Sequence, residues 1–156
     1  SAIKTFTQKV NWKDLDFIII DMPPGTGDTQ LTFSQEIKMD GAIIVSTPQE
    51  VALLDVKRGI KMFDKLGVKI LGLIDNMSYF IGDDGKKYKI FGEGGVKKTA
   101  VEYKKNFLGE IPINPEIGKC GDEGKPIVER NPKSEISKIY LNFAERIKHI
   151  YMSQNT

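Results

Sequence analysis

Residues 17–28 read FIIIDMPPGTGD, an apolar run that ends on a carboxylate and continues into a turn of prolines and glycines. A carboxylate at the carboxyl end of a buried parallel strand lies where α/β proteins bind ligands. Its burial is unfavourable without a cation or donors, and Mg²⁺ beside nucleotide phosphates is a common partner. Asp21 is therefore a candidate magnesium ligand, and Gly25 or Gly27 can bring a backbone N–H against a phosphate. The pattern alone fits equally well an Asp21 that only braces the turn.

Short runs rich in isoleucine and valine are separated by helix-length segments, which is typical of βαβ units. The runs are nearly continuous rather than alternating, as in strands buried on both faces of a parallel sheet. After the first run, Asp28 and Thr29 are candidates for capping the following helix. The sequence therefore predicts an α/β fold with strands at 17–21, 41–45, 70–74 and 107–111.

Two helices have clear sequence signals. TPQE (47–50) predicts a helix start with Thr47 as the cap, and Gly67 predicts its end. A second helix is predicted from about 132 to 152, with His149 on its polar face.

Two stretches have irregular patterns. Residues 77–95 predict a hairpin with its turn at Asp84-Gly85. Residues 112–133, rich in proline and glycine, predict a long loop.

Composition excludes several classes of protein. The chain has 156 residues, enough for one domain, and its net charge of +2 gives no support for nucleic acid as a partner. No apolar run approaches the ~20 residues that span a bilayer, and residues 1–10 have no signal-peptide core. The single cysteine, Cys120, excludes an internal disulfide, so a cytoplasmic location is expected. A start at Ser1 suggests processing, tagging or truncation.

Several motifs together resemble the Mrp/ApbC family. They are DFIIIDMPPGTGD, VSTPQEVALLDVKRGIKMF, GLIDNMSYF, IFGEGG, FLGEIPINPEI and GDEGKPIV, which follow one another in the family's order over nearly the whole chain. That family comprises deviant P-loop ATPases related to MinD, ParA and the nitrogenase iron protein, and its members carry iron–sulfur clusters. The resemblance implies a Rossmann-like three-layer P-loop NTPase fold with a mostly parallel sheet. Residues 1–156 then form the C-terminal portion of a single Mrp-type ATPase domain.

The resemblance also implies roles for individual residues, with ATP and Mg²⁺ as cofactors. Asp21 matches the Walker B aspartate that holds Mg²⁺ through water, and Gly25 matches the switch II glycine that senses the γ-phosphate. Asn76 matches the asparagine that reads the adenine edge, and Pro112 opens the loop over the base. Without the family, Asn76 is better explained as a strand-end turn residue.

The chain departs from the family at the phosphate-binding loop. No GKGGVGKS-like loop is present, because the Gly-Lys pairs at 85–86, 118–119 and 124–125 lack the upstream glycine and the following Ser/Thr. The strand and lysine of that loop are thus missing, and this chain alone is expected to be inactive as an ATPase.

The second departure concerns cluster ligands. Many members carry a CxxC pair shortly after NMSYF, where this chain reads IGDDGKKY, with Gly82 and Gly85 near the cysteine positions. One Cys120 per subunit cannot complete a four-cysteine site in a dimer, which argues against a [4Fe–4S] cluster. Cys120 is interpreted as an inert small residue.

Three functions remain as hypotheses. The first is an ATP-dependent iron–sulfur carrier or assembly factor seen as a fragment, acting on iron–sulfur apoproteins. The second is a non-catalytic partner-binding module or one part of a split ATPase. A MinD/ParA-like positioning ATPase fits less well, because the DMPPGTGD turn differs and no amphipathic anchor ends the chain.

The resemblance also predicts a problem in the sheet. The missing phosphate-loop strand belongs between the strands predicted at 17–21 and 41–45, and its loss leaves two rows of unpaired backbone groups. We therefore expect the two strands to pair directly or the gap to be filled, and a homodimer rather than a monomer.

Overall fold

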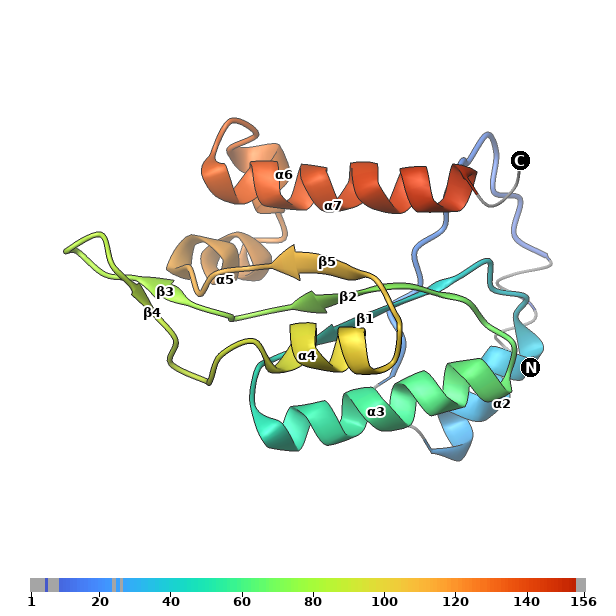
Figure 1. The fold of residues 1–156 in the computed structure, drawn as a ribbon. Helices are drawn as coiled ribbons and strands as arrows, with labels where there is room; N and C mark the ends of the chain where they lie inside the picture. The colour runs from blue at the N-terminus through green and yellow to red at the C-terminus, as the bar shows by residue number, and fades with distance from the viewer. Residues whose placement is uncertain (1–4, 6–8, 24, 26, 154–156) are drawn as a thin grey trace.

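The structure is a computed structural model that describes residues 5, 9–23, 25 and 27–153. Strands and helices alternate along most of this part of the chain (Figure 1). In chain order they are α2 (Asp28–Glu36), β1 (Ala42–Ser46), α3 (Glu50–Lys65), β2 (Ile70–Asp75), β3 (Phe80–Ile81), β4 (Lys87–Tyr88), α4 (Gly95–Glu102), β5 (Phe107–Glu110), α5 (Pro115–Asp122), α6 (Ile127–Arg130) and α7 (Glu135–Met152).

The main sheet has the strand order β1-β2-β5, and both pairings are parallel. Every residue of the central strand β2 is buried, as the continuous apolar run ILGLI predicts for a strand covered on both faces. The strands predicted at 41–45, 70–74 and 107–111 are therefore confirmed, and so is the parallel α/β fold. In the described part of the chain, β1 is an edge strand.

Helices cover both faces of this sheet, which makes three layers (Figure 1). On one face α3 and α4 bury Val56, Ile60 and Val96 against β2, and Leu31 of α2 packs onto the same cluster. On the other face Phe143 of α7 packs with residues of β2 and β5. The carboxyl ends of the three strands therefore meet at one edge, between the two helical layers.

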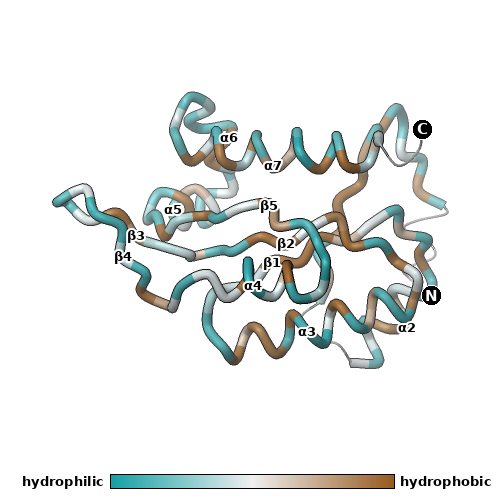
Figure 2. Tube along the Cα trace, in the orientation of Figure 1, coloured by the Kyte–Doolittle hydropathy of each residue, from teal (hydrophilic) through white to brown (hydrophobic). Residues whose placement is uncertain are grey.

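The strand predicted at 17–21 is wrong. Residues 17–21 form no strand, and the Ile19 side chain is 85% exposed. Phe17 instead packs edge-to-face on Tyr151 near the end of α7, with ring centroids 6.0 Å apart. Figure 2 shows this apolar segment outside the three-stranded sheet. This segment does not pair directly with β1, because apolar character alone does not align two backbones into a ladder.

The helix starts were predicted less well than the helices. Helix α3 ends before Gly67, as predicted, and Gly67 has φ +67. The N-cap of this helix, however, is Gln49, whose side chain makes no capping hydrogen bond. Thr47 instead donates its hydroxyl hydrogen to Gln49 Oε1 at 3.0 Å. Gly27, rather than Asp28 or Thr29, is the N-cap of α2, again without a side-chain cap bond. Two of the predicted caps are therefore wrong.

The hairpin predicted within 77–95 is confirmed. Strands β3 and β4 pair antiparallel, and Gly85 takes the left-handed conformation at φ +74. Asp84 holds the turn, because its carboxylate accepts hydrogen bonds from Lys86 N–H at 3.0 Å and from Tyr88 Oη at 2.7 Å. The α7 helix and the exposed position of His149 are also confirmed.

The long loop predicted at 112–133 is wrong, because it contains α5 and α6. Asn114 is the N-cap of α5, and its Oδ1 accepts the N–H of Glu116 at 2.8 Å, while Pro115 occupies the first helical position. An asparagine followed by proline and glutamate is a helix-start signal. The glycines at 118 and 121 concealed it, since glycine disfavours helix interiors.

We expect Asn114→Ala to destabilise the chain by about 1 kcal/mol, the usual effect of removing an N-cap side chain. Thermal unfolding followed by circular dichroism measures this. Asn114→Ser keeps a capping oxygen and should restore most of the loss; equal losses in both variants would show that the cap contributes nothing.

Candidate functional site

The carboxyl edge of the sheet is a continuous set of hydrogen-bonded strand ends. The N–H of Asn76 donates to the carbonyl of Ser46 at 2.7 Å, and the N–H of Ile111 donates to the carbonyl of Asp75 at 2.8 Å. The last residues of β1, β2 and β5 therefore lie side by side. Ligands of open α/β sheets bind at this edge.

The chain beyond β2 and β5 continues this pairing and brings Pro112 close to Asn76. Ser78 N–H donates to the carbonyl of Ile111 at 2.9 Å, and Ile113 N–H donates to the carbonyl of Tyr79 at 2.6 Å. Pro112 lies between these two bonds and is buried. Two of the four predicted site residues thus occupy adjacent segments of one edge.

Asn76 forms the turn that leaves β2. Its Oδ1 accepts the N–H of Met77 at 3.0 Å, and Met77 has a φ of +54. This is the turn role that the sequence favoured without the family. The amide nitrogen of the same side chain has no hydrogen-bond partner among the described residues, so the half-buried Asn76 keeps two donors for a ligand.

Asp21 and Gly25 lie elsewhere. Both are exposed, and no hydrogen bond or ion pair among the described residues joins them to Asn76 or Pro112. Gly25 has φ +103 and open space around its Cα, which suits a backbone that approaches a ligand. Figure 1 shows the segment that leads to α2 on the opposite side of the molecule from the β3–β4 hairpin. The structure therefore brings together two predicted site residues and leaves the other two apart.

The edge also contains a charged cluster that was not predicted. Asp75 ends β2 and is 0% exposed, and it is the ladder partner of Glu110 at the end of β5. Glu110 accepts a hydrogen bond from Ser78 Oγ at 2.6 Å and pairs with Lys89 Nζ at 2.9 Å. Both carboxylate oxygens of Asp75 lack a hydrogen-bond partner among the described residues.

The pKa values of Asp75 and Glu110 are shifted in opposite directions. Burial, and then the charge of Glu110, raise the pKa of Asp75 to about 6, although Lys89 and Ser78 act in the other direction. Burial also acts to raise the pKa of Glu110, but hydrogen bonds from Ser78 and Lys89 outweigh it and leave that pKa below its ordinary value. The hydrogen bond to Glu110 raises the pKa of Lys89. Glu110 and Lys89 thus form an ion pair, beside which Asp75 binds a proton readily.

An apolar run that ends on a carboxylate, the pattern that made Asp21 a candidate, also indicates this cluster. The buried strand ILGLID ends on Asp75, and the partly buried strand FLGE ends on Glu110. The apolar run before the glycines of DMPPGTGD, by contrast, is not a strand. A carboxylate at the end of an observed buried strand is the more direct indicator of a site at this edge.

A glycine turn closes the edge beside β1. Gly94 is the left-handed N-cap of α4, and a Cβ on Gly95 would lie 3.0 Å from the carbonyl oxygen of Pro48 and 2.6 Å from Leu53. The turn therefore packs against the start of α3, where only glycine fits. The glycines of FGEGG therefore have a packing role. Their spacing does not match the G-x-G-x-x-G motif of dinucleotide-binding proteins.

The β3–β4 hairpin follows NMSYF, where the family resemblance led us to look for a cysteine pair, and it contains no cysteine. Its cations contact Tyr79, with Lys87 Nζ 4.3 Å and Lys89 Nζ 5.4 Å from the ring centroid. Within the described residues, no group of three or more His, Cys, Asp or Glu side chains is placed to hold a metal ion. Cys120 is a free, buried thiol in α5, away from the hairpin in the sequence.

A parallel sheet with helices on both faces and a polar carboxyl edge places the chain in the class of open, three-layer α/β proteins. Residues 1–148 match the family model described as ParA, NUBPL iron-transfer P-loop NTPase, and the chain belongs to this family. The fold is similar to an Archaeoglobus fulgidus nucleotide-binding protein in complex with ADP, at TM-score 0.73 and 42% identity, covering 80% of this chain and 51% of that one. It is also similar to the Pyrococcus furiosus cell division ATPase MinD, at TM-score 0.70 and 25% identity, covering 88% and 54%.

Curated relatives have similar sequences along nearly the whole chain. The iron–sulfur cluster carrier protein of Aquifex aeolicus is 44% identical over 154 residues, which are 98% of this chain and 42% of that protein. The mitochondrial iron–sulfur protein required for NADH dehydrogenase of Arabidopsis thaliana is 47% identical over 148 residues, 94% and 47% of the two chains. The chain therefore spans less than half the length of these relatives.

No helix among the described residues is both long enough and apolar enough to cross a bilayer.

Proposed function

We propose that this chain contributes the adenine and magnesium side of an ATP-dependent iron–sulfur cluster carrier, whose phosphate-binding loop lies in a further segment. The Aquifex relative is named an iron–sulfur cluster carrier, and the Archaeoglobus structure contains ADP. Both names support this function for a chain of the same family. Its clients are then iron–sulfur apoproteins, and the working form is a homodimer.

The observation that carries the proposal is the placement of Asn76 and Pro112. They lie on adjacent segments at the carboxyl edge of the sheet, and the side-chain amide nitrogen of Asn76 has no partner among the described residues. Adenine presents ring-nitrogen acceptors that such an amide can bond, and Pro112 offers an apolar surface for the base.

The proposed roles of Asp21 and Gly25 concern the phosphate end of the nucleotide. The exposed Asp21 carboxylate is free to hold a hydrated Mg²⁺, which neutralises phosphate charge in the bound state. Gly25 offers its backbone N–H toward the terminal phosphate, because no side chain blocks its approach. Both roles require that the segment at 17–25 joins the sheet beside a phosphate loop.

A second candidate is a non-catalytic module that completes a split ATPase. The open edge of β1 and the exposed apolar segment at 17–19 favour it, since together they can accept a strand from another chain. The two candidates differ in whether the other segment comes from the same gene product.

Reconstitution with iron and sulfide tests the carrier function. We expect the chain alone to bind less than about a tenth of a [4Fe–4S] cluster per dimer, because its hairpin has Gly82 and Gly85 near the positions where the resemblance implies cysteines in many members. Absorbance near the visible iron–sulfur band and iron analysis measure the yield.

Cys120→Ala is the matched control for this experiment. A stoichiometric cluster that disappears in Cys120→Ala would contradict the expectation and make the buried thiol a ligand. A cluster that forms only when a cysteine-bearing second protein is added would support a carrier that works as part of a complex.

A further inference from the structure

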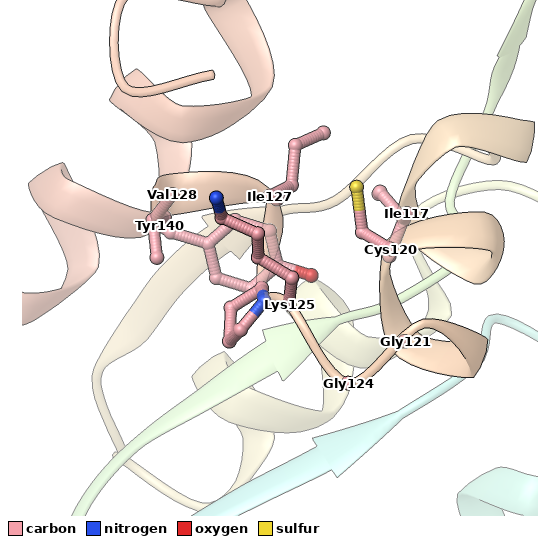
Figure 3. A pocket seen from close by; sticks show the side chains of 9 residues that line it. Ile117, Cys120, Gly121, Gly124, Lys125, Ile127, Val128 and Tyr140 are labelled. Carbon is pink, nitrogen blue, oxygen red and sulfur yellow. The ribbon is translucent and has the colours of Figure 1, made fainter. Parts of the chain in front are cut away.

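A cavity of about 370 Å³ lies on the α7 side of the molecule, and its lining residues, between 117 and 140, include none of the proposed nucleotide residues. Its walls come from α5, α6 and the α7 helix, and the segment that joins α5 to α6 forms its rim (Figure 3). The volume is within the range of small-molecule sites, about 300–1,000 Å³. Nothing in the proposed function uses this cavity.

The lining is apolar with few polar groups. Ile117, Ile127 and Val128 supply most of the apolar side chains, and Cys120 closes one wall with a side chain that is 1% exposed. Figure 3 shows Tyr140 reaching from α7 toward Cys120. Burial raises the pKa of Tyr140, so its hydroxyl keeps its proton and remains a donor.

Charge at the cavity has one sign. Lys125 is the one ionisable cation among its lining residues, and no Asp or Glu lines it. The neighbouring acid Glu123 is already paired with Arg130. No ion pair of Lys125 exists among the described residues, so its ammonium group is available to an anion.

From this lining we propose that the cavity binds a small amphipathic monocarboxylate, with its carboxylate at Lys125 and Tyr140 and its alkyl chain between α5 and α6. One ammonium and one neutral hydroxyl match a single carboxylate in charge and in donors. A second charge on the ligand would have no partner there. The apolar walls favour a chain of about six to eight carbons over a shorter one, since each buried methylene tightens binding about fourfold.

Calorimetric titration of octanoate into the purified chain tests the proposal. We expect a Kd of about 0.1–1 mM, with butyrate at least tenfold weaker because it lacks four methylenes. Lys125→Gln should weaken octanoate about fivefold or more and leave the neutral octanamide within twofold. Lys119→Gln on α5 is the matched control, since Lys119 is exposed and does not line the cavity.

Filling the cavity gives an independent test. Gly121 lines it and Gly118 does not, and a Cβ at either position of α5 meets open space. We expect Gly121→Leu to abolish octanoate binding and Gly118→Leu to preserve it, with similar circular dichroism for both. Octanoate should also slow the reaction of Cys120 with N-ethylmaleimide. Unchanged affinity in both Gly121→Leu and Lys125→Gln would overturn the proposal.

Discussion

The wild-type chain should lose stability as the pH rises from about 4 to 6, and the Asp75→Asn variant should not. Asp75 is fully buried, and neither of its carboxylate oxygens has a hydrogen-bond partner among the described residues. Its charged form is therefore poorly stabilised in the folded chain. Asparagine has nearly the same shape and does not ionise.

The sign of the effect follows from the direction of the pKa shift. The folded-state pKa of Asp75 is about 6, above its ordinary value of 3.8, so the folded chain binds this proton more tightly than the unfolded chain. The stability that the proton supplies is complete below pH 3.8. It falls as the pH rises toward 6 and is absent at higher pH.

The pKa shift of Asp75 sets an upper limit on the change in the free energy of unfolding. A shift from 3.8 to about 6 corresponds to at most about 3 kcal/mol at pH 8. Urea unfolding at pH 4 and pH 8 should show that the wild type loses about 2–3 kcal/mol more than Asp75→Asn across this range. The comparison between two pH values removes the constant penalty of burying the asparagine amide.

Asp84→Asn is the control with the opposite sign. Hydrogen bonds from the Lys86 backbone and from Tyr88 lower the pKa of the exposed Asp84. Its stabilising effect is therefore present above its ordinary pKa and lost on acidification. Asp84→Asn should thus lower stability by a constant amount throughout the window of Asp75 and change the pH dependence only below that window. An Asp75→Asn variant with the wild-type pH dependence would show that Asp75 has a partner in solution.

The sequence predicted the elements whose signals are local. The runs at 41–45, 70–74 and 107–111 became strands because both faces of a central strand must be apolar. The turn at Asp84-Gly85 formed because glycine tolerates its positive φ. Helix α5 was missed because Gly118 and Gly121 lowered its apparent propensity, while its asparagine–proline start was overlooked.

The closeness of the candidate site residues could be predicted only for those at the edge of the sheet. Asn76 and Pro112 come together because β2 and β5 are neighbours whose ends continue to pair. The run at 17–21 has the same apolar signal, yet it has no neighbouring strand and stays exposed. The pair of Asp75 and Glu110 depends on the register of two strands, which composition and periodicity do not reveal.

The largest effect is expected from supplying a phosphate-loop segment. We expect the chain alone to bind ATP-Mg with a Kd weaker than about 1 mM. Together with a separate segment that carries a GKGGVGKS-like phosphate loop, it should bind at least 100-fold more tightly. A phosphate loop supplies backbone N–H donors and a lysine to the phosphates, and this chain has no such loop.

We propose that this second segment joins at the open edge of β1. β1 pairs only with β2 in the described part of the chain, so its other edge is open to a strand. A strand placed there gives the residues at 17–21 a partner on its far side. Hydrogen exchange should then show new protection of the amides at 17–21 and 42–46. Calorimetry on the same samples gives the ATP-Mg affinity.

Three substitutions separate the parts of the completed site. Asp21→Asn should greatly reduce hydrolysis and leave the circular dichroism unchanged, because it removes the proposed magnesium contact. Asn76→Leu should weaken ATP about tenfold or more and leave tripolyphosphate unaffected, because only ATP carries the base. Gly118→Leu, on the exposed side of α5, should change neither ligand. Micromolar ATP-Mg binding by the chain alone would sink the proposal that a second segment is required, since the chain would then bind phosphates without the loop.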